Sequence, residues 1–280
     1  LQTLTFGANF NQSLDCVTLP NGLQTLTFGE DFNESLDGAA LPNGLRTLTL
    51  GDCFNQSLDG VTLPSGLQTL TLGYSFNHSL GSVILQSGLQ TLTLGRGFNQ
   101  SGLSSLKTWI FGYNGSQALP RGLRTLTFGH YFNRSLGGAT WPRGLKSLTF
   151  GCNFNQNLLG VTLPNGLQTL MFGHMFDQSL DGLTLPNGLQ IFTFGFDFNQ
   201  RLDGVTLPSG LQTLDLSRAF HQQPLDHVEL PVGLQRLKFS YAFNKPLDRV
   251  TLPSGLQTLE FGSCFNQPLD RVTLPSGLQT

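Results

Sequence analysis

A column of aspartates is the first group in this sequence whose residue type and spacing could do chemistry. Stacked carboxylates are ligands that Ca²⁺ accepts. Each copy of the repeating pattern offers only one carboxylate at this point, however, and lacks the further oxygen ligands of a calcium cage. We therefore expect solvated turn residues and no metal site at Asp15, Asp37, Asp59, Asp181, Asp203, Asp226, Asp248 and Asp270.

Asn-x-Ser triplets form a second repeated group. In a secreted protein they would be acceptors for N-linked glycans. A structural role explains the same pattern, because the Asn is retained in later copies where Pro replaces the Ser. An amide at this place can bond the backbone of the neighbouring copy and satisfy its polar groups. We favour this ladder of amides over glycosylation for the triplets at Asn11, Asn33, Asn55, Asn77, Asn99, Asn114 and Asn133.

Histidine and cysteine are the remaining reactive residues, and neither type forms a catalytic constellation. The histidines are scattered over different places in the pattern, and no nucleophile elbow, phosphate-binding loop or cysteine-pair zinc spacing is present. We therefore predict a protein that is not an enzyme, with no catalytic, cofactor-binding or metal-binding residues and no cofactor. The histidines are His78, His130, His174, His221 and His227.

The four cysteines lie in copies of the pattern that cannot bring them together. Neighbouring strands of a sheet are about 4.8 Å apart, and even the nearest cysteines are two copies apart and at different points of the copy. The geometry of a disulfide is therefore out of reach for Cys16, Cys53, Cys152 and Cys264. Free thiols are typical of a reducing compartment, so we expect an intracellular location.

Overall charge and hydropathy argue against two classes of partner. A formal net charge of −2 gives the chain no basic character for binding nucleic acid. No apolar run approaches the roughly 18 residues that a membrane-spanning helix needs. We therefore predict no nucleic-acid partner and no transmembrane segment.

The elements that position these residues come from one repeated unit. The pattern LQTLTFGxxFNQSLDGVTLPNG begins at Leu1 and returns mostly every 22 residues. Such a period is typical of a solenoid, in which each turn contacts only its neighbours. We predict one continuous solenoid over residues 1–280, which is a piece of a longer chain and whose open ends are covered by further repeats or another chain. Copies begin at Leu1, Leu23, Leu45, Leu67, Leu89, Leu106, Leu123, Leu145, Leu167, Leu189, Leu211, Leu234 and Leu256.

Each copy contains a short stretch of alternating polar and apolar residues. In the turn from Leu23 to Gly44, this alternation predicts a half-buried strand with Leu26 and Phe28 inward and the Thr residues outward. Phe32 is predicted to fill a corner of the core. A second short extended segment, clearest at residues 61–63, is predicted to form a second sheet. No segment has a helical period, so we predict an all-β, right-handed solenoid of about 13 turns of 22 residues, with two short parallel sheets and little or no helix.

Two consecutive copies, over residues 89–122, are shortened to 17 residues each. The strand at 107–111 survives in the second of them, with Trp109 expected to point inward in place of the usual Leu and Ile110 exposed. We expect these turns to narrow or bend the stack locally. They are either a notch for a partner or a tolerated deletion in the repeat.

The final copies resemble a known repeat. The run from Leu252 to Gly262, followed by residues 265–269, resembles the FNIP repeat, a member of the leucine-rich repeat superfamily, and residues 243–246 match it equally well. The resemblance covers the whole chain. It departs where Gln replaces the family's Ile after the Asn, and where Ser replaces Pro, as at Ser13 and Ser35. It implies a leucine-rich-repeat-like solenoid that serves as an interaction module without catalytic residues.

The least repetitive surface is a pair of residues after the Gly, or its replacement Ser, that ends each strand. We call these pairs the variable stripe, because stacking places them in one line while their neighbours stay constant. Tyr, Arg, Phe, Met and His are typical of protein interfaces; sequence drift at an exposed corner is the alternative. We predict a scaffold that binds a protein partner of unknown identity. The candidate partner-binding residues are Tyr74, Arg96, Tyr113, His130, Tyr131, His174, Phe196, Arg218 and Tyr241.

Outward threonine pairs suggest an alternative function. A flat array of Thr side chains on a β-solenoid resembles ice-binding surfaces, and a carbohydrate is a second ligand of that kind. Thr is also simply a favourable residue on an exposed strand. The pairs are Thr3/Thr5, Thr25/Thr27, Thr47/Thr49, Thr69/Thr71, Thr91/Thr93 and Thr125/Thr127.

Overall fold

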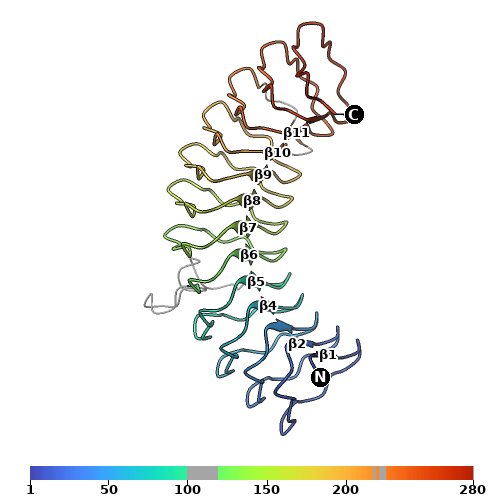
Figure 1. Ribbon diagram of the computed structural model, residues 1–280, viewed down its shortest axis with the longest axis vertical. Coiled ribbons are helices and arrows are strands. Elements are labelled where there is room, and N and C mark those ends of the chain that lie inside the picture. Colours follow the sequence, from blue (N-terminus) through green and yellow to red (C-terminus); the bar gives the residue numbers. More distant parts are fainter. Residues whose placement is uncertain (100–118, 217–218, 221–224, 280) are drawn as a thin grey trace. The chain divides into compact units, whose positions relative to one another are not determined.

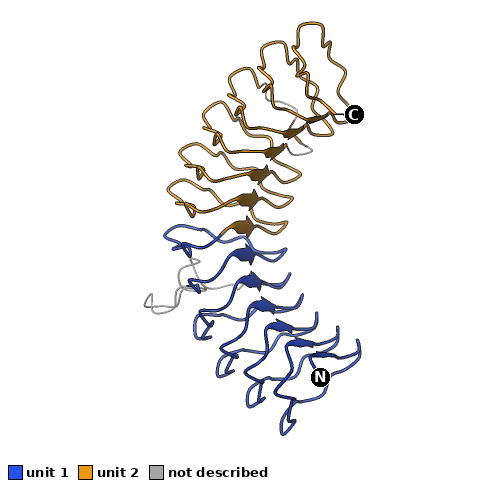
Figure 2. Ribbon diagram, in the orientation of Figure 1, with its two compact units in different colours: residues 1–145 blue, residues 146–280 orange. Residues whose placement is uncertain are grey.

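The chain folds into turns of a solenoid with one short strand in each. The computed structural model describes residues 1–99, 119–216, 219–220 and 225–279, and the chain divides into two compact units, residues 1–145 (unit 1) and residues 146–280 (unit 2) (Figure 2). The described residues contain no helix. The predicted all-β class is therefore confirmed.

Unit 1 holds six strands that pair in chain order (Figure 1). All pairs are parallel and keep the same register, so that each Thr-Leu-Thr lies beside the next, as in Thr3↔Thr25 and Thr5↔Thr27. In β2 to β6 the central Leu is buried and the flanking Thr side chains are half-buried, as the alternation predicts. The strands are β1 (Thr3–Thr5), β2 (Thr25–Thr27), β3 (Thr47–Thr49), β4 (Thr69–Thr71), β5 (Thr91–Thr93) and β6 (Thr125–Thr127).

Unit 2 repeats the arrangement with a more varied outer face. Its six strands also follow chain order, but Thr gives way to Met171, Ile191, Asp215 and the charged residues of the last two strands. The strands are β7 (Ser147–Thr149), β8 (Thr169–Met171), β9 (Ile191–Thr193), β10 (Thr213–Asp215), β11 (Arg236–Lys238) and β12 (Thr258–Glu260).

The core is a stack of identical layers of Leu and Phe. Leu26, Phe28 and Phe32 are at most 3% exposed, which confirms their predicted inward orientation. The corner Phe of each turn lies over the corner Phe of the next, with ring centroids 5.9 Å apart for Phe32 and Phe54 and an angle of 5° between the planes. One turn alone cannot bury such a face, so the turns stabilise one another.

The predicted asparagine ladder is present in both units. The Oδ1 atom of Asn33 accepts a hydrogen bond of 2.8 Å from the backbone N–H of Asn55, one turn further on. Asp177 takes the same place in unit 2, and its carboxylate accepts from the N–H of Asn199 at 2.9 Å. The other rungs join Asn11 to Asn33, Asn55 to Asn77, Asn77 to Asn99, Asn99 to Asn133, Asn155 to Asp177 and Asn244 to Asn266.

The second predicted sheet is not formed in the described residues. The return segment at 61–63 has no strand. Its backbone pairing is local: the N–H of Val61 donates to the carbonyl of Leu58, and just after the segment the N–H of Leu67 donates to that of Pro64. The bond from the next turn comes from a side chain, because Nε2 of Gln86 donates to the carbonyl of Leu63. Pro64 has no N–H to give to a ladder, so the return segments contribute apolar side chains without pairing.

The described residues form twelve strands, against the roughly 13 turns predicted. In unit 1, β5 pairs directly with β6, with Leu92 opposite Leu126. The predicted strand at 107–111, with Trp109 and Ile110, lies outside the described residues.

Candidate functional site

The variable stripe occupies the tight corner that follows each strand. In the turn of β4, the N–H of Phe76 donates to the carbonyl of Gly73 at 3.2 Å, so Tyr74 and Ser75 stand at the two corner positions. Gly73 lies so close to the preceding turn that a methyl group there would be 1.7 Å from the carbonyl oxygen of Gly51. Gly permits this approach at residue 73 because it has no Cβ, and it marks where the stripe residues begin.

Within each unit, backbone hydrogen bonds join many of the described stripe pairs to the pair of the neighbouring turn. The N–H of Ser75 donates to the carbonyl of Asp52 at 2.7 Å, and the N–H of Tyr131 donates to that of Arg96 at 3.0 Å. In unit 2 the N–H of Asp197 donates to the carbonyl of His174 at 2.8 Å. The stripe is therefore an ordered part of each unit, and its side chains are held in register.

The stripe of unit 1 carries a cluster of two tyrosines and an arginine. The guanidinium carbon of Arg96 lies 5.0 Å from the centre of the Tyr74 ring and 5.8 Å from that of Tyr131, which are cation–π distances. Tyr74 is 42% and Tyr131 38% exposed. The ring of His130 stands edge-on to Tyr131 at 4.9 Å. The structure thus brings four of the predicted site residues together.

The tyrosines of this cluster also bond each other. The side-chain hydrogen bond between Tyr74 and Tyr131 raises the pKa of the Tyr74 hydroxyl above its ordinary value, while the charge of Arg96 acts in the opposite direction. The Tyr74 hydroxyl therefore stays protonated at physiological pH. The cluster presents exposed aromatic rings, the imidazole of His130 and the positive charge of Arg96.

The stripe of unit 2 carries a second aromatic cluster. The rings of His174 and Phe196 are stacked, with centroids 4.3 Å apart and an angle of 8° between their planes. The Nδ1 atom of His174 lies 3.6 Å from a carboxylate oxygen of Asp197. Met175, beside them in the sequence, is 47% exposed. This pairing of His174 with Asp197 was not predicted, because the sequence gives no distance between stripe residues of neighbouring turns.

Tyr241 lies further along unit 2, at the rim of a hollow of about 350 Å³ that Phe196, Asp215 and Lys238 also line. Partial burial raises the pKa of the Asp215 carboxyl, which Glu260 also raises, while the charges of Lys238 and Arg236 lower it. Tyr113 and Arg218, the two remaining predicted stripe residues, lie outside the described residues.

The aspartate column and the Asn-x-Ser triplets have structural explanations. The Oγ atom of Ser57 accepts a hydrogen bond of 3.0 Å from the N–H of Asp59, two residues later, and Ser13, Ser35 and Ser179 do the same. This local bond stabilises the turn. The Asn of each triplet within the described residues belongs to the ladder, and Asn114 lies outside those residues. Within the described residues, no group of three or more His, Cys, Asp or Glu side chains is placed to hold a metal ion, and the four cysteines are unpaired.

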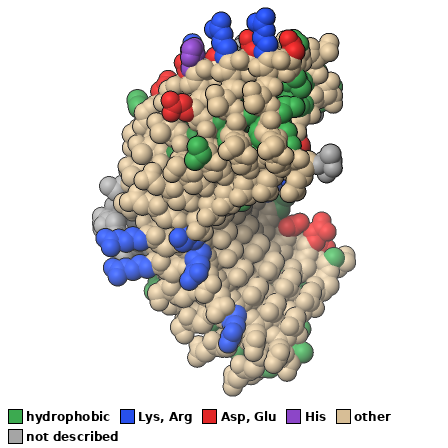
Figure 3. Space-filling view, turned by 45° about the horizontal axis from the view of Figure 1, so that its top comes forward, with side chains coloured by type: hydrophobic (Ala, Val, Ile, Leu, Met, Phe, Trp, Pro, Cys, Tyr) green, Lys and Arg blue, Asp and Glu red, His purple; other side chains and the backbone are tan. Residues whose placement is uncertain are grey.

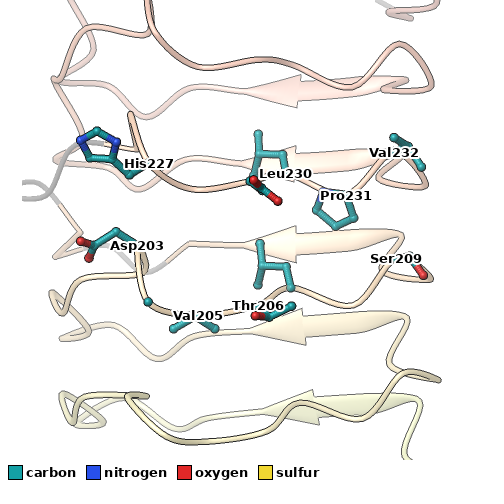
Figure 4. A pocket seen from close by; sticks show the side chains of 11 residues that line it. Asp203, Val205, Thr206, Ser209, His227, Leu230, Pro231 and Val232 are labelled. Atoms are coloured by element: carbon teal, nitrogen blue, oxygen red, sulfur yellow. The ribbon is translucent and has the colours of Figure 1, made fainter.

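A hollow of about 430 Å³ lies between two return segments of unit 2 (Figure 4). Asp203 and His227 stand near one end of it, and Ser209 and Val232 near the other. The Asp203 carboxylate is bound by both Nε and Nη2 of Arg201, at 2.9 and 2.6 Å, and this hydrogen-bonded pairing lowers the pKa of Asp203. An engaged, ionised carboxylate is a poor general base, so we do not place chemistry in this hollow.

Two surfaces were missed by the sequence predictions. Met171 and Ile191 are 36% and 38% exposed on the strand face of unit 2, at places where the strands of unit 1 have Thr. In unit 1, a hollow of about 370 Å³ is lined by Arg121, Trp141 and Arg143. The distribution of charge along the sequence is the signal that could have found it.

Comparison with known proteins agrees with this geometry. A family model described as FNIP Repeat matches residues 1–31, 10–53, 32–75, 54–97, 132–175, 154–197, 176–219 and 220–264. The chain belongs to the FNIP repeat family. The FNIP copies are thus found in both units, and the resemblance seen in the sequence is confirmed. A search of curated proteins gave no match.

Two solved structures are similar to this FNIP-repeat chain. CroV588, described as a circular leucine-rich repeat protein, is 35% identical over 99% of the chain, with a TM-score of 0.79. The chain spans 42% of the length of CroV588. An internalin (inlF) of Listeria monocytogenes is 14% identical over 100% of the chain and 86% of its own, with a TM-score of 0.50. The solenoid is therefore of the leucine-rich-repeat kind.

The described part of this FNIP-repeat chain was also searched for helices that could cross a membrane. It contains no helix with the length and apolar character that a membrane span requires.

Proposed function

We propose that the chain is a non-enzymatic scaffold that binds a protein partner through its variable stripe. The observation that carries this proposal is the cluster in unit 1, where Arg96 is stacked between the exposed rings of Tyr74 and Tyr131. Tyr and Arg are the residue types on which binding energy concentrates in protein interfaces.

The rigidity of the stripe supports the same function. Its backbone is bonded from turn to turn, and Arg96 is already held by two rings. Binding therefore orders few side chains, and less affinity is lost to conformational entropy. The stacked His174 and Phe196 give unit 2 a similar set of prearranged rings.

The leucine-rich-repeat fold supports a scaffold and not a reaction. Both similar structures are repeat proteins. The stripe clusters offer exposed rings, a guanidinium and a His–Asp pair, which are groups suited to contacts with a partner. We further propose an intracellular location, which the four unpaired cysteines support.

The test is a binding titration with a partner isolated on the wild-type protein. Changing Tyr74, Arg96 and Tyr131 to Ala one at a time is expected to weaken binding by about tenfold or more, because such residues contribute above 1 kcal/mol when central to an interface. Ile84→Thr is the matched control, since Ile84 is exposed on a return segment and Thr62 holds the same place one turn earlier. Full affinity in all three stripe variants would exclude this surface.

A second candidate function rests on the two threonine columns of unit 1. They are in register from Thr3 and Thr5 to Thr125 and Thr127, with no break in the described strands. Such an array suits ordered water or a carbohydrate. Thermal hysteresis and a glycan array test it, and a lack of signal in both removes it.

A further inference from the structure

The charges of unit 1 are sharply divided along the sequence, although the chain as a whole is nearly neutral. Residues 1–59 hold seven Asp and Glu but a single basic residue, Arg46. Residues 60–145 hold six Lys and Arg and no Asp or Glu. The net charge of −2 conceals this division, so it gives no guide to the local potential.

Two of these arginines stand on stacked turns just before the strands. The turn Pro120–Leu123 places Arg121 at a corner, and the turn Pro142–Leu145 places Arg143 at the equivalent corner. The two turns are in contact, since a methyl group added at Gly144 would lie 3.2 Å from the carbonyl oxygen of Arg121. Earlier turns of unit 1 have neutral residues at this corner, namely Asn21, Asn43, Ser65 and Ser87.

The same two arginines line the hollow of about 370 Å³, together with Leu119, Thr140, Trp141 and Pro142. Trp141 takes the place that Leu19 and Leu63 hold in other turns, where the Leu side chain is buried. The larger ring is only half-buried and forms one wall. Its Nε1 atom is buried without a hydrogen-bond partner, so the wall contains a donor that a small rotation of the ring would offer to an acceptor.

The arginines of this hollow are free to bind. Arg121 and Arg143 are exposed and make no ion pair or hydrogen bond with any part of the chain that the structure describes. Arg134, by contrast, donates from Nη2 to the carbonyl of Asn99 at 3.2 Å, and Arg96 is held between tyrosines. In Figure 3, the group of Lys and Arg side chains at the lower left has no Asp or Glu among it, whereas those at the top of the view stand beside Asp and Glu.

We infer that the Trp141 hollow is a binding site for an acidic peptide segment of a protein partner. The guanidinium groups of Arg121 and Arg143 receive carboxylates of the segment, since their planar donor pairs match a carboxylate. The segment's apolar stems pack on the ring of Trp141. This inference takes the protein nature of the ligand from the proposed function, but it concerns a different surface, before the strands and not after them.

The distribution of positive charge favours a short peptide over a nucleic acid. A nucleic-acid strand carries a phosphate at every step and needs a track of basic groups. Here the arginines that line the hollow lie on two consecutive turns, and the strand face beside them is uncharged threonine. Two adjacent cations and an aromatic wall match two or three acidic side chains.

The test uses the full chain and a fluorescein-labelled peptide of alternating Glu and Gly residues. Fluorescence anisotropy is measured for the wild type and for Arg121→Asn combined with Arg143→Asn, a change to the residue that other turns use at this corner. We expect the variant to bind about tenfold more weakly, and wild-type affinity to fall as NaCl is raised. Arg46→Gln is the control: it removes the same kind of charge from an exposed site, and Gln24 and Gln68 hold its place in neighbouring turns.

A second measurement reads the wall of the hollow directly. In a Trp109→Phe background, Trp141 is the sole tryptophan, and its emission is expected to change as the Glu peptide is added. A peptide with Lys in place of Glu should leave it unchanged. Equal affinity of the wild type and the double variant, an equal loss in Arg46→Gln, or tighter and Arg121-dependent binding of single-stranded oligothymidine would each overturn the inference. If the stripe variants lose the natural partner while the double variant retains it, this inference fails and the proposed function stands.

Discussion

Replacing Gly73 by Ala tests the close approach of turns that positions the variable stripe. A methyl group at Gly73 would lie 1.7 Å from the oxygen and 2.5 Å from the carbon of the Gly51 carbonyl, where real contacts are essentially never under 3.0 Å. Both atoms belong to the backbone, so no side chain can swing away. The strand ends must separate by more than an ångström, within a ladder whose spacing is fixed by hydrogen bonds.

We expect this separation to lower the free energy of unfolding by about 1–3 kcal/mol, as overpacking a protein core does. In a chain of this size, each kcal/mol lowers the melting temperature by roughly 2–4 °C. Far-UV circular dichroism on heating measures the change. Gly88→Ala is the control, because the nearest atom to a methyl group there is the Ser65 carbonyl oxygen at 3.4 Å, and we expect a change within about 0.5 kcal/mol. Equal melting temperatures of Gly73→Ala and Gly88→Ala would refute the close approach of the turns at Gly73.

Three further substitutions test other parts of the fold. Asn55→Ala removes the acceptor for the N–H of Asn77 and is expected to cost about 0.5–1.5 kcal/mol in urea denaturation, whereas Asn55→Asp keeps an acceptor and should cost less. Cys16→Gly is expected to stabilise unit 1 by about 1 kcal/mol, because Cys16 has a φ of 62° where Gly38 and Gly60 stand in later turns; a lower midpoint would contradict this. Burial raises the pKa of Asp215, so its carboxyl stabilises the fold while protonated, and this contribution is lost as the pH rises through the folded-state pKa. Asp215→Asn should therefore raise the melting temperature at neutral pH by the equivalent of a few tenths of a kcal/mol and have no effect at a pH below the ordinary carboxyl pKa. A gain that persists in acid would exclude this cause.

The core of each turn was predictable because its signals are local. The alternation around Leu26 and the constant Phe32 depend only on neighbouring residues and on the stacking of identical turns. The amide ladder was predictable for a related reason. The Asn at the place of Asn33 is kept in later copies where Pro replaces the Ser two residues after it, so its role does not depend on that Ser.

Features that depend on distances between turns could not be predicted in the same way. The return segment at 61–63 looks like a strand in isolation, but Pro64 and the local bonds of Val61 leave it unpaired. The direct pairing of β5 with β6 could not be predicted either, because the repeat pattern does not state which strands become neighbours.

The clusters of the candidate site depend both on local residue types, which the sequence shows, and on distances between turns, which it does not. Tyr74, Arg96 and Tyr131 were recognised as interface-type residues, but their mutual stacking depends on which turns become neighbours. Arg121 and Arg143 were overlooked because net charge was taken over the whole chain.

Hydroxyl-radical footprinting of the free and partner-bound protein tests the central claim most directly, because it reads the solvent exposure of individual side chains. Tyr74, Tyr131, Met175 and Tyr241 are exposed in the free chain and belong to residue types that oxidise readily. If the variable stripe is the binding surface, the partner will protect Tyr74 and Tyr131, and Leu159, in the turn where other copies have Asp, will keep its reactivity. Unchanged oxidation of both tyrosines, together with protection of Leu159, would contradict the account.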